Sequence, residues 1–437
     1  MEYHARYATY PPTTHFKNTI KSNALIERIE ELDLYEPLCL YVNAPFRQQL
    51  CWCSGCNEIN ENYYVDGRQY VNFLKREIAL YGQVLGGRGR PTSVHFGGCA
   101  PKYLLCDDIE EILGAIERQI GLVDETNLTI EIDPRLMRGN EISRLAELGF
   151  KRFSLGLQDF DPFVQQAIDR HQSFELVDGC VSECRTSGID DLAFCLLYGL
   201  PMQTEKSFAE SIQKAIALSP DRISVFKYVI EDQATDSLKI EGVKARSSVM
   251  LRESLVGAAT EILLDAGYVH IGFDQFAKSE NVLANARRNG RLRLKFDGFS
   301  DDASSSMIGF GASAISFVNG VYSQNENSVS RYQASLLADE LPIMQGYRRT
   351  NRETKIAAVI ENLLCNQEAD IGSVLNSSQP LEAIRILAIL DRMAAEGLIN
   401  WRDDTVAVVN GAYGLAHDIA TAIDPYARHE VEYELAI

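Results

Sequence analysis

Short β-rich runs alternate with amphipathic helical stretches from about residue 38 onwards, and no other feature limits the possible folds as much. Such alternation is typical of a parallel sheet covered by helices. Helical spacing is clear in places, because Phe208, Ile212 and Ile216 recur every four residues. Six runs have strand character, at residues 38–46, 93–98, 128–133, 152–158, 192–200 and 222–229. Six such units predict an α/β fold, specifically a (β/α)6 partial barrel.

The pattern changes towards the C-terminus. Residues 268–276 predict one further strand. From about Tyr347 the chain becomes mainly helical, with Ile356, Val359 and Ile360 on one face. Residues 397–401 and 405–409 then have the composition of a hairpin. This part of the chain therefore predicts a small helical domain with a β wing.

Charge and hydropathy exclude several classes of partner. The 437 residues contain 42 Lys and Arg against 61 Asp and Glu, a net charge of −19. Such an acidic chain is not expected to bind nucleic acid or an anionic membrane, and a cap over the barrel is a better use for the winged segment. No apolar run approaches the roughly 18 residues of a membrane helix, and the N-terminus lacks a signal-peptide pattern. We expect a cytoplasmic protein whose ten cysteines are thiols or metal ligands.

Three of those cysteines lie within six residues, directly after the first predicted strand. They are Cys51, Cys53 and Cys56, and Arg47 stands four positions before the first of them. In parallel barrels the chemistry lies at the carboxyl ends of the strands, which is where this loop falls. The position and the density of thiols favour a metal-binding, iron–sulfur type of loop.

Many blocks of sequence, in one order from end to end, resemble the oxygen-independent coproporphyrinogen III oxidase family of the radical S-adenosylmethionine (SAM) superfamily. Among them are Leu-Tyr-Val-Asn-Ala-Pro-Phe at residues 40–46 and His-Phe-Gly-Gly at 95–98. Further blocks are found at residues 6–13, 130–135, 154–160, 198–201, 221–226, 311–316 and 322–325. The resemblance implies an N-terminal extension (1–35), a radical SAM-like partial barrel with additional strands (36–345) and a C-terminal helical and winged cap domain (346–437).

The resemblance also implies a chemistry. In the family, three thiolates hold a [4Fe–4S] cluster whose open iron chelates SAM, and an electron donor reduces it. The resulting radical removes hydrogen from propionate side chains of coproporphyrinogen III, which become vinyl groups. The family's contacts to the SAM on the cluster fall on Tyr41, Gly98, Glu131 and Ile315. Its remaining SAM contacts, including part of a second SAM site, fall on Gln158, Arg170 and Val229.

The chain departs from the family pattern at the cluster loop. The motif Cys-x-x-x-Cys-x-x-Cys falls on Arg47, Cys51 and Ser54, so two of the three ligand positions are not cysteine. Arginine stays protonated and serine is a poor substitute for a thiolate. Elsewhere Asn43 stands in place of a histidine, Cys195 in place of an aspartate, and Cys99 and Ala100 in place of a Gly-Thr pair.

Two interpretations follow from the altered loop. In the first, Cys51, Cys53 and Cys56 hold the cluster in a shifted register, and the chain is a SAM-dependent oxidative decarboxylase of coproporphyrinogen or a related tetrapyrrole. In the second, the loop no longer binds metal, and the chain is a catalytically inactive relative that binds heme or a tetrapyrrole as a carrier or sensor. Arg47 would then pair with a propionate, since a guanidinium matches a carboxylate in a bidentate fork.

Overall fold

The computed structural model describes residues 7–44, 67–98, 104–228, 249–296, 298–409 and 414–427. The chain divides into two compact units. The larger unit comprises Asn18–Tyr268 and Ser304–Gly346, and the smaller comprises Met1–Lys17, Val269–Ala303 and Tyr347–Ile437. The domain boundaries at residues 35/36 and 345/346 stay a prediction, because compactness alone does not test them.

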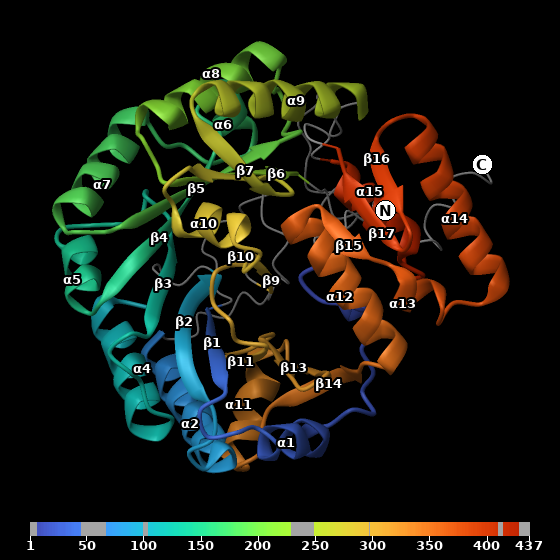
Figure 1. Cartoon of the computed structure of the whole chain (residues 1–437). Helices are drawn as coiled ribbons and strands as arrows, with labels where there is room; N and C mark the ends of the chain where they lie inside the picture. The colour runs from blue at the N-terminus through green and yellow to red at the C-terminus, as the bar shows by residue number, and fades with distance from the viewer. Residues whose placement is uncertain are drawn as a thin grey trace. The chain divides into compact units, whose positions relative to one another are not determined.

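A parallel sheet forms the core of the larger unit (Figure 1). Its successive neighbours are β1 (Pro37–Ala44), β2 (Arg90–Gly98), β3 (Asn127–Ile132), β4 (Phe150–Gln158), β5 (Asp191–Tyr198) and β6 (Arg222–Lys227). Each pairs with the next in parallel. All six predicted strands are therefore confirmed, with ends shifted by up to three residues.

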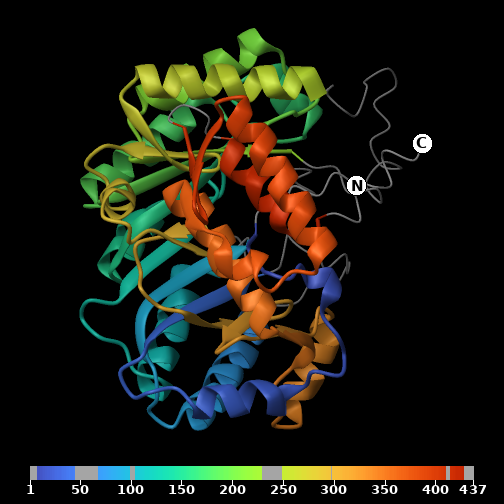
Figure 2. The same ribbon diagram turned by 45° about the vertical axis from the view of Figure 1, so that its right-hand side comes forward.

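Helices connect these strands and cover one face of the sheet, as Figure 1 shows for α2, α4, α5 and α7. They are α2 (Gly67–Leu85), α4 (Cys106–Gln119), α5 (Glu141–Glu147), α6 (Pro162–Ala167), α7 (Phe174–Thr186), α8 (Glu205–Ala217) and α9 (Val249–Asp265). Among these helices, α8 is the one whose apolar residues predicted it by their spacing. It begins at a capping box in which the Thr204 side chain accepts a hydrogen bond from the Ser207 N–H. It lies beside α9 (Figure 1, Figure 2). No helix in the described ranges is long and apolar enough to cross a membrane.

The two faces of the sheet differ in chemistry because side chains alternate along a strand. On the helix-covered face, Leu40, Phe96 and Phe194 are wholly buried, as are their neighbours on the other strands. The opposite face carries Tyr41, His95, Glu131, Ser154 and Cys195, whose side chains all bear a polar group. Glu131, Ser154 and Cys195 are only partly buried. A sheet of this kind presents a polar face that can receive a ligand.

Further strands extend the sheet on the β1 side. β11 (Ser306–Phe310) pairs with β1 in parallel, and β12 (Ile315–Val318) and β13 (Val321–Asn325) continue as antiparallel neighbours. β14 (Ile343–Arg348) follows β13 in the sheet order. The helices of this region are α1 (Ser22–Glu30) and α11 (Val329–Leu337). A mixed sheet of this size fits the predicted partial barrel with additional strands.

The smaller unit contains the predicted hairpin, formed by β16 (Ile399–Arg402) and β17 (Thr405–Val408). β15 (Glu368–Asp370) pairs with β17 on the other side. The helices and the short 3-10 turn are η1 (Thr13–His15), α10 (Val282–Arg288), α12 (Asn351–Asn366), α13 (Gly372–Leu375), α14 (Pro380–Ala395) and α15 (Leu415–Ile423). The helical and winged character predicted for the C-terminal part is confirmed.

One strand prediction is wrong. Residues 268–276 do not form a single strand but two, β7 (Tyr268–Gly272) and β8 (Gln275–Lys278). Phe273 between them has a φ of +52°, which ends the extended conformation and turns the chain. Apolar residues occur on both sides of the turn, at Ile271 and Phe276, so apolar content alone does not reveal it. β9 (Arg293–Lys295) and β10 (Gly298–Ser300) form a second short antiparallel pair in this unit.

Candidate functional site

Strand register brings the predicted SAM-contact residues of β1, β2 and β3 to one end of the sheet. Tyr41 is opposite His95, and Ala44 is opposite Gly98. Phe96 is opposite Ile130, which places Glu131 close to the carboxyl ends of the same strands. Because the strands are parallel, all these ends lie at the same edge, as predicted.

Glu131 is the centre of a small polar cluster. Its Oε2 accepts a hydrogen bond from the Gly98 N–H at 3.2 Å, and its Oε1 lies 3.4 Å from His95 Nε2. The His95 ring stacks on Tyr41, with centroids 5.3 Å apart and an interplanar angle of 13°. The Glu131 side chain nevertheless keeps 42% of its surface exposed. A carboxylate held in place on one side and open on the other can accept hydrogen bonds from a ligand's ammonium or hydroxyl groups.

Two glycines at the end of β2 leave room for this arrangement. A Cβ on Gly97 would lie 2.2 Å from Tyr41 Oη, so any side chain would displace the tyrosine. Gly98 has a φ of +82°, and a Cβ there would lie 2.8 Å from the Ala44 carbonyl oxygen. Glycine alone satisfies both the conformation and the close approach of backbones. The same lack of side chains exposes backbone groups to a ligand.

Arg170 lies at the ends of β3 and β4, where it is almost completely buried. Its Nη1 lies 3.1 Å from Asp133 Oδ2, and its Nη2 donates to the Gly156 carbonyl oxygen. Arg135 forms a second ion pair with Asp133, at 2.6 Å. Burial raises the pKa of Asp133, but the hydrogen bond from Arg135 and the charge of Arg170 outweigh it and lower the pKa overall. The predicted contact between Arg170 and SAM stays a prediction, since the observed partners are structural.

Gln158 and Cys195 lie on the neighbouring strands β4 and β5. Gln158 has a φ of +68°, and the β4–β5 register shifts by one residue between Gly156 and Gln158. Such a bulge redirects a side chain at the end of a strand. The Cys195 thiol is partly exposed and lies 3.7 Å from the Ser154 hydroxyl. A second SAM contact at Gln158 remains a prediction.

Ile315 is the first residue of β12 and is buried. A Cβ on Gly309 of β11 would lie 2.3 Å from the Ile315 carbonyl oxygen, so the two backbones are in direct contact. Gly309 is also opposite Tyr41 in the register of β1 and β11. Ile315 is thereby placed near the same end of the sheet as Tyr41.

Six of the predicted positions lie outside the described residues. They are Val229 and the cluster-loop positions Arg47, Cys51, Cys53, Ser54 and Cys56. Within the described ranges, no group of three or more His, Cys, Asp or Glu side chains is arranged to hold a metal ion.

Two residues at the carboxyl ends of β2 and β3, His95 and Asp133, were not among the predicted contacts. Both lie within blocks that carry the family resemblance, at residues 95–98 and 130–135, and that is the signal that could have indicated them. His95 orients Glu131, and Asp133 orients Arg170.

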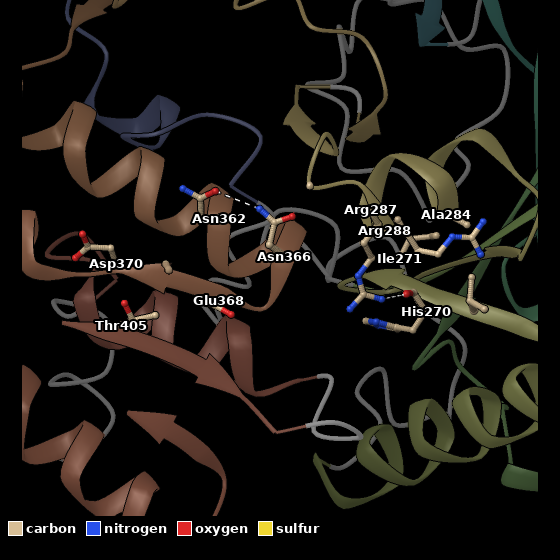
Figure 3. A pocket seen from close by; sticks show the side chains of 13 residues that line it. His270, Ile271, Ala284, Arg287, Arg288, Asn362, Asn366, Glu368, Asp370 and Thr405 are labelled. Atoms are coloured by element: carbon tan, nitrogen blue, oxygen red, sulfur yellow. Dashed lines mark hydrogen bonds between the residues drawn. The ribbon is translucent and has the colours of Figure 1, made fainter. Parts of the chain in front are cut away.

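A separate cavity of about 650 Å³ lies within the smaller unit. Figure 3 shows His270 and Arg287 on one side of it and Asn366 and Asp370 on the other. Arg287 donates to the His270 carbonyl oxygen, and Asp370 accepts from the Gly372 N–H, so these groups also serve the local fold. None of the predicted site residues that the structure describes lines this cavity.

The fold and the residues at its strand ends define a protein of the radical SAM superfamily, and residues 51–215 match the family model of that superfamily. The chain is 31% identical over 425 residues to an oxygen-independent coproporphyrinogen III oxidase of Bradyrhizobium diazoefficiens, covering 96% of this chain and 94% of that one. It is 32% identical over 428 residues to the enzyme of that name from Pseudomonas aeruginosa, covering 96% and 93%.

Structure agrees with sequence. Coproporphyrinogen III oxidase from Escherichia coli, described as a radical SAM enzyme, superposes with a TM-score of 0.87 at 28% identity, covering 96% of this chain and 97% of that one. The chain belongs to the oxygen-independent coproporphyrinogen III oxidase family, a family of heme biosynthesis. The predicted fold and family are confirmed.

Arg170→Met is expected to lower the free energy of unfolding by about 2–3 kcal/mol, because it removes one partner of a buried ion pair and a hydrogen bond to a backbone carbonyl. Arg135 still compensates Asp133, which limits the loss. Urea denaturation measures the effect. Arg138→Met, at an exposed position in the same region, is the matched control and should change stability by less than about 0.5 kcal/mol. Equal effects of the two changes would contradict the buried ion pair.

Proposed function

We propose that this chain binds SAM at the carboxyl ends of β1, β2 and β3 and the amino end of β12, and that it catalyses the oxidative decarboxylation of propionate side chains on a coproporphyrinogen-type tetrapyrrole. The observation that carries the proposal is the cluster of Tyr41, Gly98 and Glu131 at one edge of a parallel sheet, each on the position that matches a family contact to SAM. The names of the relatives support the substrate class.

The groups at the carboxyl ends of β1, β2 and β3 have the chemistry that binding of SAM requires. Glu131 offers acceptors for an ammonium or for ribose hydroxyls, and the glycines of β2 allow close backbone approach. Tyr41 and Ile315 supply apolar surface beside them, each with less than a tenth of its surface exposed. When bound to a reduced cluster, SAM supplies a carbon-centred radical that removes hydrogen from the substrate. The residues of this chain bind SAM, orient it and shield it from water.

For the cluster, the donor set provides the argument. Cys51, Cys53 and Cys56 are three thiols, the number that a site-differentiated [4Fe–4S] cluster needs to leave one iron open. We assign the cluster to these three thiols, with Arg47 and Ser54 as residues that replace two family ligands. An electron donor is part of the same proposal, since the cluster must be reduced.

Electron paramagnetic resonance tests this proposal. Protein purified anaerobically and reconstituted with iron and sulfide is reduced with dithionite, and spectra are recorded with and without SAM. A cluster signal that SAM perturbs supports the proposal. An iron content below about three per chain would refute the enzymatic function, given the four-iron requirement.

A second candidate function rests on the residues at positions 47 and 54, which are not cysteine. In this alternative the protein binds heme or a coproporphyrin without turnover, and Arg47 pairs with a propionate. Titration of heme or coproporphyrin into cluster-free protein is the test. Arg47→Ala should weaken binding whereas Arg138→Ala, at an exposed position, should not. Absence of binding to cluster-free protein would remove this alternative.

Glu131→Gln is expected to raise the Kd for SAM about 10- to 100-fold, because a charge-assisted hydrogen bond to the ligand becomes a neutral one. The amide oxygen of the introduced glutamine can still accept from the Gly98 N–H, so the strand ends should keep their geometry. Equilibrium dialysis of the reconstituted protein measures the Kd. Glu125→Gln, at a position where the native side chain is 80% exposed, is the control. An unchanged Kd would show that Glu131 does not contact SAM.

A further inference from the structure

Helix α2 carries a completely buried carboxylate, Glu77, that the proposed chemistry does not use. Its Oε2 accepts hydrogen bonds from the Gly311 N–H and the Tyr332 hydroxyl, both at 2.7 Å. Its Oε1 accepts from Asn325 Nδ2, also at 2.7 Å. Among the described residues no Lys, Arg or His forms an ion pair with it, and its hydrogen-bond partners are neutral. A buried carboxylate with three donors and no counter-ion costs stability, so its position calls for another explanation.

The partners of Glu77 surround one turn. Gly311 follows β11, and Asn325 Nδ2 donates to the Gly311 carbonyl oxygen at 2.8 Å as well as to Glu77. The two polar groups of Gly311, its N–H and its C=O, are thus both bound by side chains. This turn leads within a few residues into Ile315, the first residue of β12.

The same turn is tied to the end of β1. Asn43 Nδ2 donates to the Ala312 carbonyl oxygen at 2.8 Å. Tyr70, which lies on α2 as Glu77 does, accepts from the Ala312 N–H at 2.9 Å and donates to the Asn43 carbonyl oxygen at 3.1 Å. Helix α2, the end of β1 and the turn after β11 therefore form one hydrogen-bonded unit, the Glu77 network. Its members are Glu77, Tyr332, Asn325, Tyr70 and Asn43, with the peptide groups of Gly311 and Ala312.

We propose that Glu77 is a positioning residue for the SAM pocket: through the Gly311 N–H it fixes the turn that holds Asn43 at the end of β1 and places Ile315. The inference rests on the proposed function, because Tyr41 and Ile315 are pocket residues only if SAM binds there. Asn43 then acts through its amide as a link between strands, in place of the family's imidazole. The network therefore acts on the last residues of β1, which ends at Ala44.

Glu77 changes its protonation state between pH 5 and pH 8. Burial raises the pKa of Glu77 to about 7, against the hydrogen bonds from Tyr332, Gly311 and Asn325, which lower it. The titratable groups facing it are Tyr70 and Tyr81 from α2 and Tyr332 from α11, and burial raises the pKa of each further above its ordinary value. These tyrosines stay neutral between pH 5 and 8, so within the network Glu77 alone changes charge there.

The first test measures the unfolding equilibrium of the full chain at pH 5 and pH 8. A carboxyl group whose folded pKa exceeds its unfolded value stabilises fully below the unfolded pKa, and that stabilisation is lost as the pH rises to the folded pKa. The pKa of Glu77 rises from 4.5 in the unfolded chain to about 7 in the folded one. This shift alone makes the unfolding constant about 70-fold larger at pH 8 than at pH 5. Glu77→Gln removes this rise. The ratio of the variant's unfolding constant to that of the native chain should therefore fall by about 70-fold from pH 5 to pH 8.

The second test measures positioning directly. Amide hydrogen exchange, corrected for intrinsic rates, is followed by mass spectrometry in peptides that cover residues 309–316 and 38–44. Glu77→Gln should speed exchange in both by at least about tenfold at pH 8, since the Gln side chain presents an N–H group towards one of the three donors. Asp191→Asn is the matched control, because Asp191 is a buried carboxylate at the opposite, amino end of β5. It should leave both peptides unchanged.

SAM affinity completes the experiment. Glu77→Gln is expected to raise the Kd of the reconstituted protein for SAM by about tenfold at pH 8 while Asp191→Asn leaves it unchanged. If the native chain binds no SAM, the proposed function fails, whereas the exchange data still test the network. Unchanged exchange at residues 309–316 in Glu77→Gln would overturn the positioning role, whatever the SAM result.

Discussion

Replacement of Cys51, Cys53 and Cys56 together by alanine is expected to reduce the iron content of the reconstituted protein from about four per chain to below one. The reason is chemical: the family positions 47 and 54 hold arginine and serine, so these three thiols are the only thiolates the loop offers. Iron and sulfide assays on anaerobic samples measure the effect. The dithionite-reduced signal and any conversion of coproporphyrinogen III should disappear with the iron.

A matched control uses thiols that lie elsewhere. Cys180, Cys184 and Cys365 are buried in helices, and their replacement by alanine should leave the iron content unchanged. Arg47→Cys together with Ser54→Cys restores the family's ligand spacing with Cys51. If the native chain binds no iron and this double variant binds about four, the rearranged cluster is wrong and the tetrapyrrole-binding alternative gains support.

The parallel sheet could be predicted because each strand is buried on one face by helices and partly open on the other. The runs that predicted β2 and β5 are short, apolar and bounded by turns. The predicted ends of both strands lie within three residues of the observed ends. The split between β7 and β8 could not be predicted, because it depends on the backbone conformation of Phe273 and not on apolar content.

The SAM-contact side of the site was predictable only in part. Tyr41 and Glu131 lie in blocks that carry the family resemblance, so their positions followed from sequence. Glu77 has no such signal: it is one acidic residue in a helix of mixed composition, 234 residues before the Gly311 that it contacts. A buried acidic residue on an amphipathic helix looks like a solvated one until the fold brings its partners to it.

Gly311→Ala is expected to lower the free energy of unfolding by about 2–6 kcal/mol, the largest stability effect among the proposed substitutions. Gly311 has a φ of +104°, where an L-residue is strained by about 1–3 kcal/mol. In addition, a Cβ there would lie 2.4 Å from the Asn43 carbonyl oxygen and 2.6 Å from the Tyr70 hydroxyl. Relief requires movement of the end of β1 or of α2, which adds about 1–3 kcal/mol of overpacking cost.

Gly320→Ala separates strain from contact. Gly320 has a φ of +79° in the loop between β12 and β13, and a Cβ there would have no neighbour within 4 Å. It should therefore cost only about 1 kcal/mol, from backbone conformation alone. Urea denaturation at constant pH compares the two variants, and equal losses would show that the contacts with Asn43 and Tyr70 are not decisive.

The two glycines should also differ in how they combine with Glu77→Gln. Gly311 donates to Glu77, so a double-mutant cycle between these positions is expected to give a coupling energy of at least about 0.5 kcal/mol. Gly320 shares no partner with Glu77 among the described contacts, so its cycle should be additive within about 0.5 kcal/mol. Coupling at Gly311 together with additivity at Gly320 would mean that the carboxylate acts on the end of β1 through the turn at Gly311. Additivity at both would mean that Glu77 and the turn are stabilised independently.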